Sequence, residues 1–291
     1  MRTFTLVNAA GETCNITDRS LFFHDPAGLG FSRDPLYRQV GNRWVIVNKR
    51  TQQTSISGRV ALVSDDPYLS YFNFVQFVNQ EPLTLMYIPN NEASSEVASG
   101  VTYRRSVIIK HMSKSELTRE GYLDCDIEFA PLGPWYKYVA ISNGTDSVVN
   151  SLKWGVTWGI NWGPLDDYSN GIRSDSGIDS PSRLTIFGPV VNPSWKHYVN
   201  GIEFETGKLD NVSIGANEYI VVDKIALPST IRKYSAVNGE VLEDLYSKSD
   251  FTTKRFLTIK SGINTVAVTG EEPGSLEPVV KLEAYIYYES V

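Results

Sequence analysis

The side chains best suited to chemistry in this sequence are three tryptophans spaced four residues apart. Residues 154–163 read Trp-Gly-Val-Thr-Trp-Gly-Ile-Asn-Trp-Gly, which places Trp154, Trp158 and Trp162 at equal intervals. Large apolar residues fill the even positions of this segment, and small or polar residues fill the odd positions. This alternation has a period of two and predicts a β-strand with one aromatic face. The three glycines also disfavour a helix, each by about 1 kcal/mol relative to alanine.

An aromatic strand face of this kind has two possible roles. Exposed tryptophans can stack on the rings of sugars, and Tyr168 is near enough in sequence to join such a platform. Buried tryptophans instead fill cores and subunit interfaces, where most large aromatic side chains lie. The glycine face of the strand would let another backbone approach closely, which favours packing. We therefore expect the packed role and a mostly buried Trp158, and we keep glycan stacking as the alternative.

The other polar residues form no catalytic or metal-binding pattern. His24, His111 and His197 do not pair with another His, Cys or Glu at a spacing typical of metal ligands. The neighbouring acids Asp166-Asp167 and Glu271-Glu272 do not by themselves indicate a glycosidase, which needs two carboxyl groups about 5–9 Å apart across a cleft. The nucleophile-elbow and phosphate-loop motifs do not occur. The sequence predicts a protein that is not an enzyme and that has no catalytic, cofactor-binding or metal-binding residues.

Three acidic residues alternate with apolar ones in the segment 122–129. Asp124, Asp126 and Glu128 would share one face of a strand, and such a face could hold a cation. A solvated face is the favoured interpretation, because polar alternation is what a half-buried strand ordinarily shows. The basic residues expected opposite it on the neighbouring strand are Arg104, Arg105 and Lys110.

Composition limits the class of protein. The 291 residues suit about two domains, and a net charge of −6 without any long basic block argues against nucleic-acid binding. Cys14 and Cys125 have no metal or redox spacing, so we expect both to be reduced and buried. Without a run of 18 apolar residues we expect no membrane span, and the N-terminus lacks the apolar core of a signal peptide.

The first half of the chain mostly predicts short strands, including apolar runs at residues 44–47 and 57–62. One helix is expected at residues 68–78, since Asp66 can cap it and Pro67 suits its first turn. Its polar residues recur every three positions and form one narrow stripe, so the helix should be largely buried. These polar residues are Ser70, Asn73 and Gln76.

The second half predicts strands throughout. Turn-rich residues at 142–147 place a domain boundary there, which gives domains at residues 1–142 and 143–291. Short strands separated by regular turn signals, such as Asn200-Gly201, are typical of a β-sandwich or jelly roll.

The order and spacing of several stretches point to a known family. In the N-terminal half they are residues 4–8, 28–31, 56–62, 68–78, 83–89, 103–109, 121–129 and 134–136. In the C-terminal half they are residues 184–193, 218–223 and 256–266. In this arrangement the chain resembles the distal tail proteins and related baseplate components of long-tailed phages that infect Gram-positive bacteria.

The resemblance implies a mainly β fold with two domains. The first would be a β-barrel or sandwich-like domain with one short helix, which forms a hexameric ring. The second would be a jelly-roll β-sandwich similar to galectins and carbohydrate-binding modules. The acidic charge of the chain suits a ring through which DNA passes, because a negative wall repels phosphates.

The resemblance also implies a structural role in the virion, after synthesis in the cytoplasm of the host bacterium. The implied partners are other copies of the chain, the tail tube protein, the tail-tip hub or tail-associated lysin, and receptor-binding or other baseplate proteins. No catalytic residues or cofactors are carried over. The alternative function is a carbohydrate-binding adhesion module that contacts host cell-wall polysaccharide through Trp154, Trp158 and Trp162.

Overall fold

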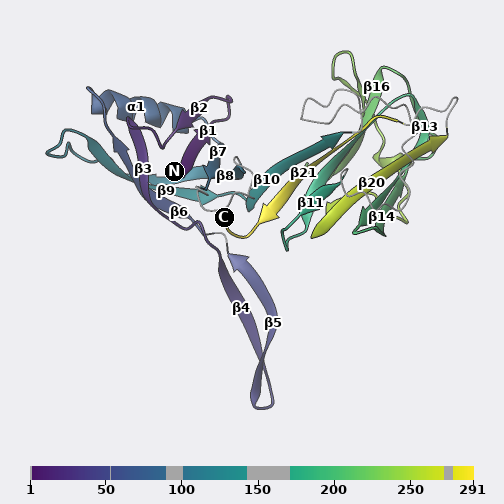
Figure 1. The fold of residues 1–291 in the computed structure, drawn as a ribbon, viewed down its shortest axis with the longest axis horizontal. Helices are drawn as coiled ribbons and strands as arrows, with labels where there is room; N and C mark the ends of the chain where they lie inside the picture. Colours follow the sequence, from purple (N-terminus) through teal and green to yellow (C-terminus); the bar gives the residue numbers. More distant parts are fainter. Residues whose placement is uncertain (1, 53, 90–100, 143–170, 272–277) are drawn as a thin grey trace, which may run out of the picture. The chain divides into compact units, whose positions relative to one another are not determined.

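The computed structural model of the chain describes residues 2–52, 54–89, 101–142, 171–271 and 278–291. They form two compact units: unit 1 contains Met1–Lys137 and Tyr287–Val291, and unit 2 contains Tyr138–Ile286. The chain leaves unit 1 within strand β10 and returns within strand β21. The predicted mainly β fold is confirmed (Figure 1). The predicted domains at 1–142 and 143–291 stay a prediction.

Unit 1 is an antiparallel sheet with one helix. Its elements are β1 (Thr3–Val7), β2 (Thr13–Asn15), β3 (Leu21–Ala27), β4 (Ser32–Val40), β5 (Arg43–Gln52), β6 (Ile56–Leu62), α1 (Pro67–Val78), β7 (Leu83–Ile88), β8 (Tyr103–Met112), β9 (Leu123–Pro131) and the first residues of β10 (Trp135–Ser142). The strands pair in the order β2-β1-β7-β8-β9-β6-β3. The two edges of this sheet also meet, since Phe23 N donates to the Ile16 carbonyl and the Phe4 and Phe23 rings lie 5.2 Å apart. The sheet therefore curls around a single core.

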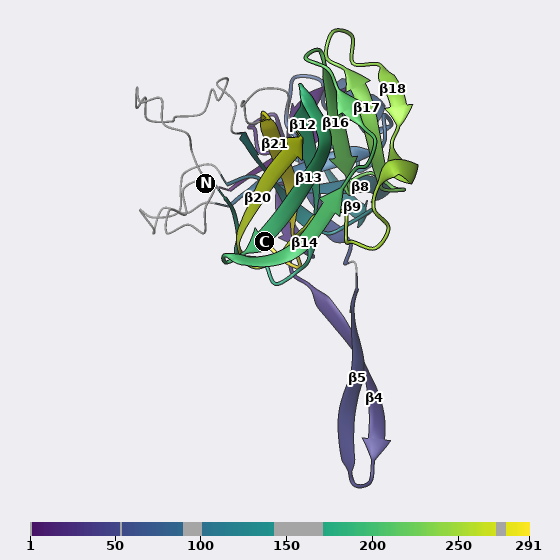
Figure 2. The same cartoon turned by 90° about the vertical axis from the view of Figure 1, so that its right-hand side faces the viewer.

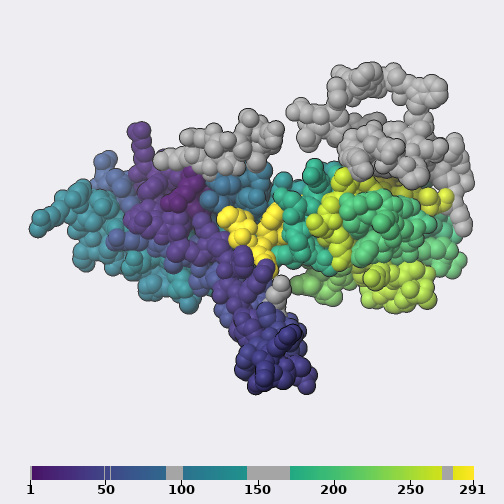
Figure 3. Space-filling model, turned by 60° about the horizontal axis from the view of Figure 1, so that its bottom comes forward, coloured from purple at the N-terminus to yellow at the C-terminus, as the bar shows by residue number. Residues whose placement is uncertain are grey.

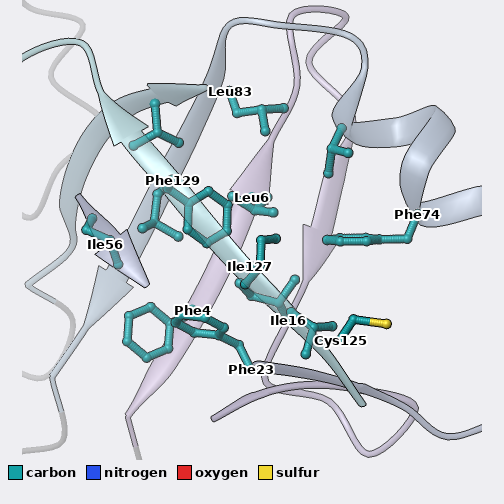
Figure 4. Close-up of a cluster of buried hydrophobic side chains, with 14 of the residues drawn as sticks. Phe4, Leu6, Ile16, Phe23, Ile56, Phe74, Leu83, Cys125, Ile127 and Phe129 are labelled. Carbon is teal, nitrogen blue, oxygen red and sulfur yellow. The ribbon is translucent and has the colours of Figure 1, made fainter. Parts of the chain in front are cut away.

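Strand β9 shows how the sequence builds this core (Figure 4). Its alternate residues Leu123, Cys125, Ile127 and Phe129 are buried, as the period-two pattern predicts. Figure 4 shows Cys125, Ile127 and Phe129 among side chains from other elements. The alternation therefore places these four side chains on one face of the strand, and the packed sheet buries that face.

The acidic face of β9 is neutralised by neighbouring bases. Arg59 Nη2 lies 2.6 Å from an Asp124 oxygen, and Lys110 Nζ lies 2.7 Å from a Glu128 oxygen. Lys110 is one of the expected partners. Arg105 is instead buried, where its Nε donates to the Gly133 carbonyl at 2.9 Å. Asp124 and Glu128 are therefore paired with bases and partly covered, whereas Asp126 is exposed to solvent.

Helix α1 begins as the sequence predicts but is less buried than expected. Asp66 caps it by accepting a hydrogen bond from Leu69 N at 3.0 Å, and Pro67 occupies the first turn. Phe74 and Val78 are buried, whereas Leu69 and Phe72 are 54% and 55% exposed. The expectation of a largely buried helix is wrong, because unit 1 covers α1 on one side only.

Unit 2 consists of two sheets and a short 3₁₀ turn. Its elements are β11 (Ile172–Ser174), β12 (Ser180–Phe187), β13 (Val190–Val199), β14 (Ile202–Lys208), β15 (Ser213–Ile214), β16 (Glu218–Asp223), β17 (Thr230–Ser235), β18 (Val241–Asp244), η2 (Tyr246–Lys248), β19 (Thr258–Ile259), β20 (Gly262–Glu271) and β21 (Val280–Tyr288). One sheet has the order β18-β17-β16-β12-β21, and the other has the order β11-β20-β13-β14. Inward residues of both sheets, such as Ile186 and Trp195, are buried. This arrangement agrees with the predicted β-sandwich.

A buried polar network fixes the loop between β19 and β20. His197 is fully buried, with Nδ1 3.2 Å from Glu205 Oε2 and Nε2 3.1 Å from Asn264 Oδ1. The orientation of the Asn264 amide follows from its Nδ2, which donates to the Lys260 and Gly262 carbonyls. An ionised Glu205 can only accept hydrogen bonds, so Nδ1 of His197 donates to it. Sequence reasoning found no partner for His197, because its partners come from other strands.

The pH dependence of unfolding should report on this pair. Burial alone would raise the pKa of Glu205, but hydrogen bonds from His197 and Thr258 outweigh it and hold the pKa below its ordinary value. The resulting stabilisation is present above the unfolded-state pKa and is lost as pH falls through the lower folded-state pKa. We expect Glu205→Gln to lower the free energy of unfolding by about 2 kcal/mol at pH 7, because it removes a buried carboxylate that accepts hydrogen bonds from His197 and the Thr258 backbone. We also expect a weaker loss of stability between pH 6 and pH 3 than in the unchanged protein.

Urea unfolding followed by tryptophan fluorescence at several pH values measures both effects. Glu203→Gln is the matched control, because Glu203 is on the same strand but its pair with Lys196 is solvent-exposed. Equal stability losses in the two variants would contradict a stabilising role for the buried Glu205 carboxylate.

Candidate interaction surfaces

The part of the chain that the structure describes contains no cluster of side chains suited to hold a metal ion. Among the described residues, no three His, Cys, Asp or Glu side chains gather as metal ligands would. Within the same residues, no helix combines the length and apolar character needed to cross a membrane. Cys14 and Cys125 are both free thiols; Cys125 is buried and Cys14 is half-buried. The candidate functional surfaces of the described residues are groups of exposed apolar and aromatic side chains.

The tryptophan strand predicted from the sequence lies outside the described residues. This holds for Trp154, Trp158 and Trp162, and also for Tyr168 and the acidic pair Asp166-Asp167. Their packing or glycan-stacking role, and the burial of Trp158, stay predictions.

The most exposed apolar surface of unit 1 is the hairpin of β4 and β5, which we call the arm (Figures 1 and 2). The two strands pair only with each other over nearly their whole length, from Ser32↔Gln52 to Val40↔Arg43. Gly41 has a φ of +60°, a left-handed conformation that suits the tight turn between them. Figure 3 shows the arm in dark purple as a protrusion from the surface.

Both faces of the arm carry large apolar side chains. Cross-strand partners share a face, so Tyr37 and Ile46 lie on the same side as Trp44. Leu36, Val40 and Val45 lie on the opposite side. These side chains and Val47 are between 49% and 67% exposed. A contiguous exposed apolar surface of this kind marks an interaction site.

The arm is attached to unit 1 at its base. Thr51 Oγ1 donates to Glu289 Oε1 at 3.0 Å, and Arg33 forms an ion pair with the same carboxylate. Next to the base, Gly28 has a φ of +83°, and a Cβ there would overlap the Ser55 carbonyl oxygen. These contacts fix where the arm begins and leave its outer part, residues 36–47, exposed.

A second exposed apolar surface of unit 1 lies on α1 and the adjoining β8–β9 loop; we call it the α1 surface. Its exposed apolar residues are Val63, Tyr68, Leu69, Phe72 and Leu117. Two contacts hold the loop against the helix. Tyr68 Oη donates a hydrogen bond to Glu116 Oε2 at 3.1 Å, and Lys114 Nζ lies 5.2 Å from the Tyr68 ring centre. The hydrogen bond to Glu116 raises the pKa of Tyr68.

Unit 2 carries a different exposed cluster, built around Arg255. The guanidinium carbon of Arg255 lies 4.1 Å from the Phe251 ring centre and 4.8 Å from that of Tyr246. Its Nη2 donates to Tyr246 Oη at 2.9 Å, and its backbone carbonyl accepts a hydrogen bond from buried Trp195. Phe251 is 59% exposed. The cluster therefore presents aromatic rings held in place by a cation.

Sequence reasoning missed the arm as a surface. The consecutive apolar residues 44–47 indicate only a strand, and such a run is typical of a buried one. The sequence feature that indicates the hairpin is Gly41-Asn42. A Gly-Asn pair between two extended runs is typical of the turn of a β-hairpin. The exposed face of α1 gave no signal, because helix periodicity does not show which side a sheet covers.

Comparisons with known proteins agree with this architecture. Residues 3–132 match the family model of the distal tail protein, N-terminal domain. A chain of the phage P2 baseplate in its activated conformation with Ca has a TM-score of 0.61 at 14% identity, with 100% of both chains covered. The crystal structure of the SPP1 Dit (gp 19.1) protein has a TM-score of 0.58 at 11% identity, covering 97% of this chain and 98% of that one.

A comparison with curated protein sequences gave no match. At these identities the two structures establish the fold, and the family model identifies the N-terminal part. The resemblance predicted from the sequence is therefore confirmed. Residues 3–132 therefore match the distal tail protein, N-terminal domain, and the chain as a whole shares the fold of two phage tail-tip proteins.

Proposed function

We propose that this protein forms a hexameric ring at the tail tip, which joins the tail tube to the tail-tip hub. Residues 1–142 would form the ring, and the jelly-roll domain at 143–291 would project outward and anchor receptor-binding or other baseplate proteins. The protein would be synthesised in the cytoplasm of the host bacterium and function in the virion without catalysis. The description of the similar SPP1 protein as a paradigm of the hub adsorption apparatus supports this role.

The observation that carries the proposal is the arm. A two-stranded ribbon has no second layer, so it cannot bury either of its faces within its own unit. The arm nevertheless exposes seven large apolar side chains to solvent: Leu36, Tyr37, Val40, Trp44, Val45, Ile46 and Val47. Such a surface costs free energy in a monomer and stabilises an assembly that covers it. We infer that unit 1 is built to join other subunits.

Removal of the arm tests the proposal. We expect a variant with residues 37–47 replaced by Asn-Gly to stay folded, because the deleted side chains are exposed and contribute little to the core. The same variant should fail to form rings, since an apolar interface loses its central aromatic anchors. Mass photometry and negative-stain imaging of the purified protein, and of virions produced with it, measure assembly directly.

The matched control for the arm variant is the double substitution Leu227→Ser and Val237→Ser. These residues are at least as exposed as those of the arm but belong to unit 2. We expect the control to assemble normally. Virions whose tail tips contain no ring of this protein would overturn the proposed function.

The Arg255 cluster gives a specific reason to keep carbohydrate binding as a second candidate. Exposed aromatic rings such as Phe251 and Tyr246 can stack on sugar rings, and the Arg255 guanidinium lies against both of them. This candidate concerns unit 2 and is compatible with a ring formed by unit 1.

Binding to purified host cell-wall polysaccharide tests this second candidate. If the polysaccharide stacks on the cluster, Phe251→Ala should weaken binding about fivefold, corresponding to the loss of about 1 kcal/mol from one aromatic contact. Leu242→Ala, an exposed apolar position elsewhere in unit 2, is the control. Absence of binding by the unchanged protein would eliminate the candidate.

A further inference from the structure

We propose that the Arg255 cluster and the neighbouring ring of Phe204 bind an anionic sugar polymer, whose charged groups contact Lys254 and Arg255. This inference rests on the second candidate of the proposed function, carbohydrate binding by unit 2, and names the chemical class of the ligand. It concerns unit 2 alone and does not depend on ring formation by unit 1.

Phe204 lies at an irregularity of β14 that leaves its ring exposed. Strand β14 is the last strand of its sheet (Figure 2). Its pairing with β13 shifts between Tyr198↔Glu203 and His197↔Glu205, so Phe204 is an extra residue without a partner in the register. This pattern is a β-bulge, a feature that often re-aims a side chain next to a functional site. The Phe204 side chain is 40% exposed.

Two ammonium groups lie against the Phe204 ring. Lys260 Nζ is 5.1 Å and Lys254 Nζ is 5.3 Å from its centre, within the range of a cation–π contact. We call these three residues the Phe204 group. Lys254 is directly followed by Arg255, whose guanidinium carbon lies 4.1 Å from the Phe251 ring centre. The Phe204 group and the Arg255 cluster therefore adjoin each other along the chain.

Lys254 and Arg255 differ from most bases of unit 2 in having no carboxylate partner among the described residues. The bases of unit 2 that do pair with a carboxylate are Arg183, Lys196, Lys208, Arg232, Lys233, Lys248, Lys260 and Lys281. Arg255 Nη2 donates to Tyr246, but Arg255 Nε has no hydrogen-bond partner in the described part of the chain. Asp250, in the same loop, accepts hydrogen bonds from Thr252. Two consecutive positive charges are thus available to an external anion.

The residue types specify the class of ligand. Lysine and arginine form charge-assisted hydrogen bonds with phosphate and carboxylate groups, and exposed aromatic rings stack on sugar rings. Phe204 contacts one of the two consecutive cations and Phe251 contacts the other. This arrangement suits a polymer in which sugar rings alternate with anionic groups. Because the whole chain has a net charge of −6, it has no general attraction for polyanions, and binding requires such a local site.

Binding of the full-length protein to matched polymers tests the ligand class. Dextran, carboxymethyl-dextran and phosphorylated dextran share one sugar backbone and differ in their charged groups, whereas polyphosphate carries charge without sugar. We expect at least one of the two anionic dextrans to bind about tenfold more tightly than dextran and polyphosphate. The tighter of the two identifies the anion as carboxylate or phosphate. Biolayer interferometry measures each dissociation constant.

Charge reversal at Lys254 tests the location of the site. Lys254→Glu should weaken binding to the anionic dextrans and to host cell-wall polysaccharide about tenfold, and should leave binding to dextran unchanged. Arg173→Glu is the matched control, because Arg173 is also exposed and also lacks a carboxylate partner among the described residues. It lies on β11, at the opposite edge of the sheet from β14. Both substitutions are at the surface, and circular dichroism shows that each variant keeps its fold.

Removal of the Phe204 ring tests the sugar contact separately. Phe204→Ala should weaken binding to the anionic dextrans about fivefold and leave binding to polyphosphate unchanged, because polyphosphate has no sugar ring to stack. Leu242→Ala is again the control for loss of an exposed apolar side chain.

The outcomes distinguish this inference from the proposed function. Equal binding to all three dextrans would overturn the anionic ligand and leave the carbohydrate candidate in place, as would host polysaccharide whose binding depends on Phe251 but not on Lys254. Polyphosphate bound as tightly as the anionic dextrans, or equal effects of Lys254→Glu and Arg173→Glu, would overturn it because charge alone would explain binding. If the unchanged protein binds neither the dextrans nor host polysaccharide, both the inference and the carbohydrate candidate fail, while the ring proposed for unit 1 is unaffected.

Discussion

A two-stranded ribbon cannot bury its own side chains, and this constraint determines which apolar side chains of unit 1 are exposed. In a curled sheet such as that of β1, β7, β8, β9, β6 and β3, one face is covered by the other strands and the helix. Among the described residues the arm has no such cover, and seven of its large apolar side chains are exposed. The assembly proposed for this protein would bury these side chains against another molecule.

The remainder of unit 1 serves to hold that surface in place. Glu289, from the last residues of the chain, accepts a hydrogen bond from Thr51 and pairs with Arg33 at the base of the arm. The left-handed Gly28 lets the chain pass close to Ser55 as it enters the arm. A residue near the C-terminus of the chain thus helps to hold the base of the arm in unit 1.

Unit 2 uses polar interactions where unit 1 relies on apolar ones. The buried His197 and Glu205 connect neighbouring strands, and Asn264 and the Thr258 backbone extend the network into the loop between β19 and β20. The same region carries Arg255 and its aromatic partners on the surface. Breaking a buried hydrogen-bond network costs free energy, so this network restrains the loop between β19 and β20. The Arg255 cluster lies close to that loop in sequence.

Much of the architecture follows from the sequence alone. The alternation in β9, the Asp66 cap with Pro67, and the turn signals of the second half determine a mainly β protein with one helix, because they depend only on neighbours along the chain. Tertiary structure decided which faces are covered. Leu69, Phe72 and the run at 44–47 are exposed because no strand covers them in the described residues. Glu205 lies next to His197 because β13 and β14 pair in the folded sheet. Local periodicity specifies a face, but only the packed fold determines whether that face is covered.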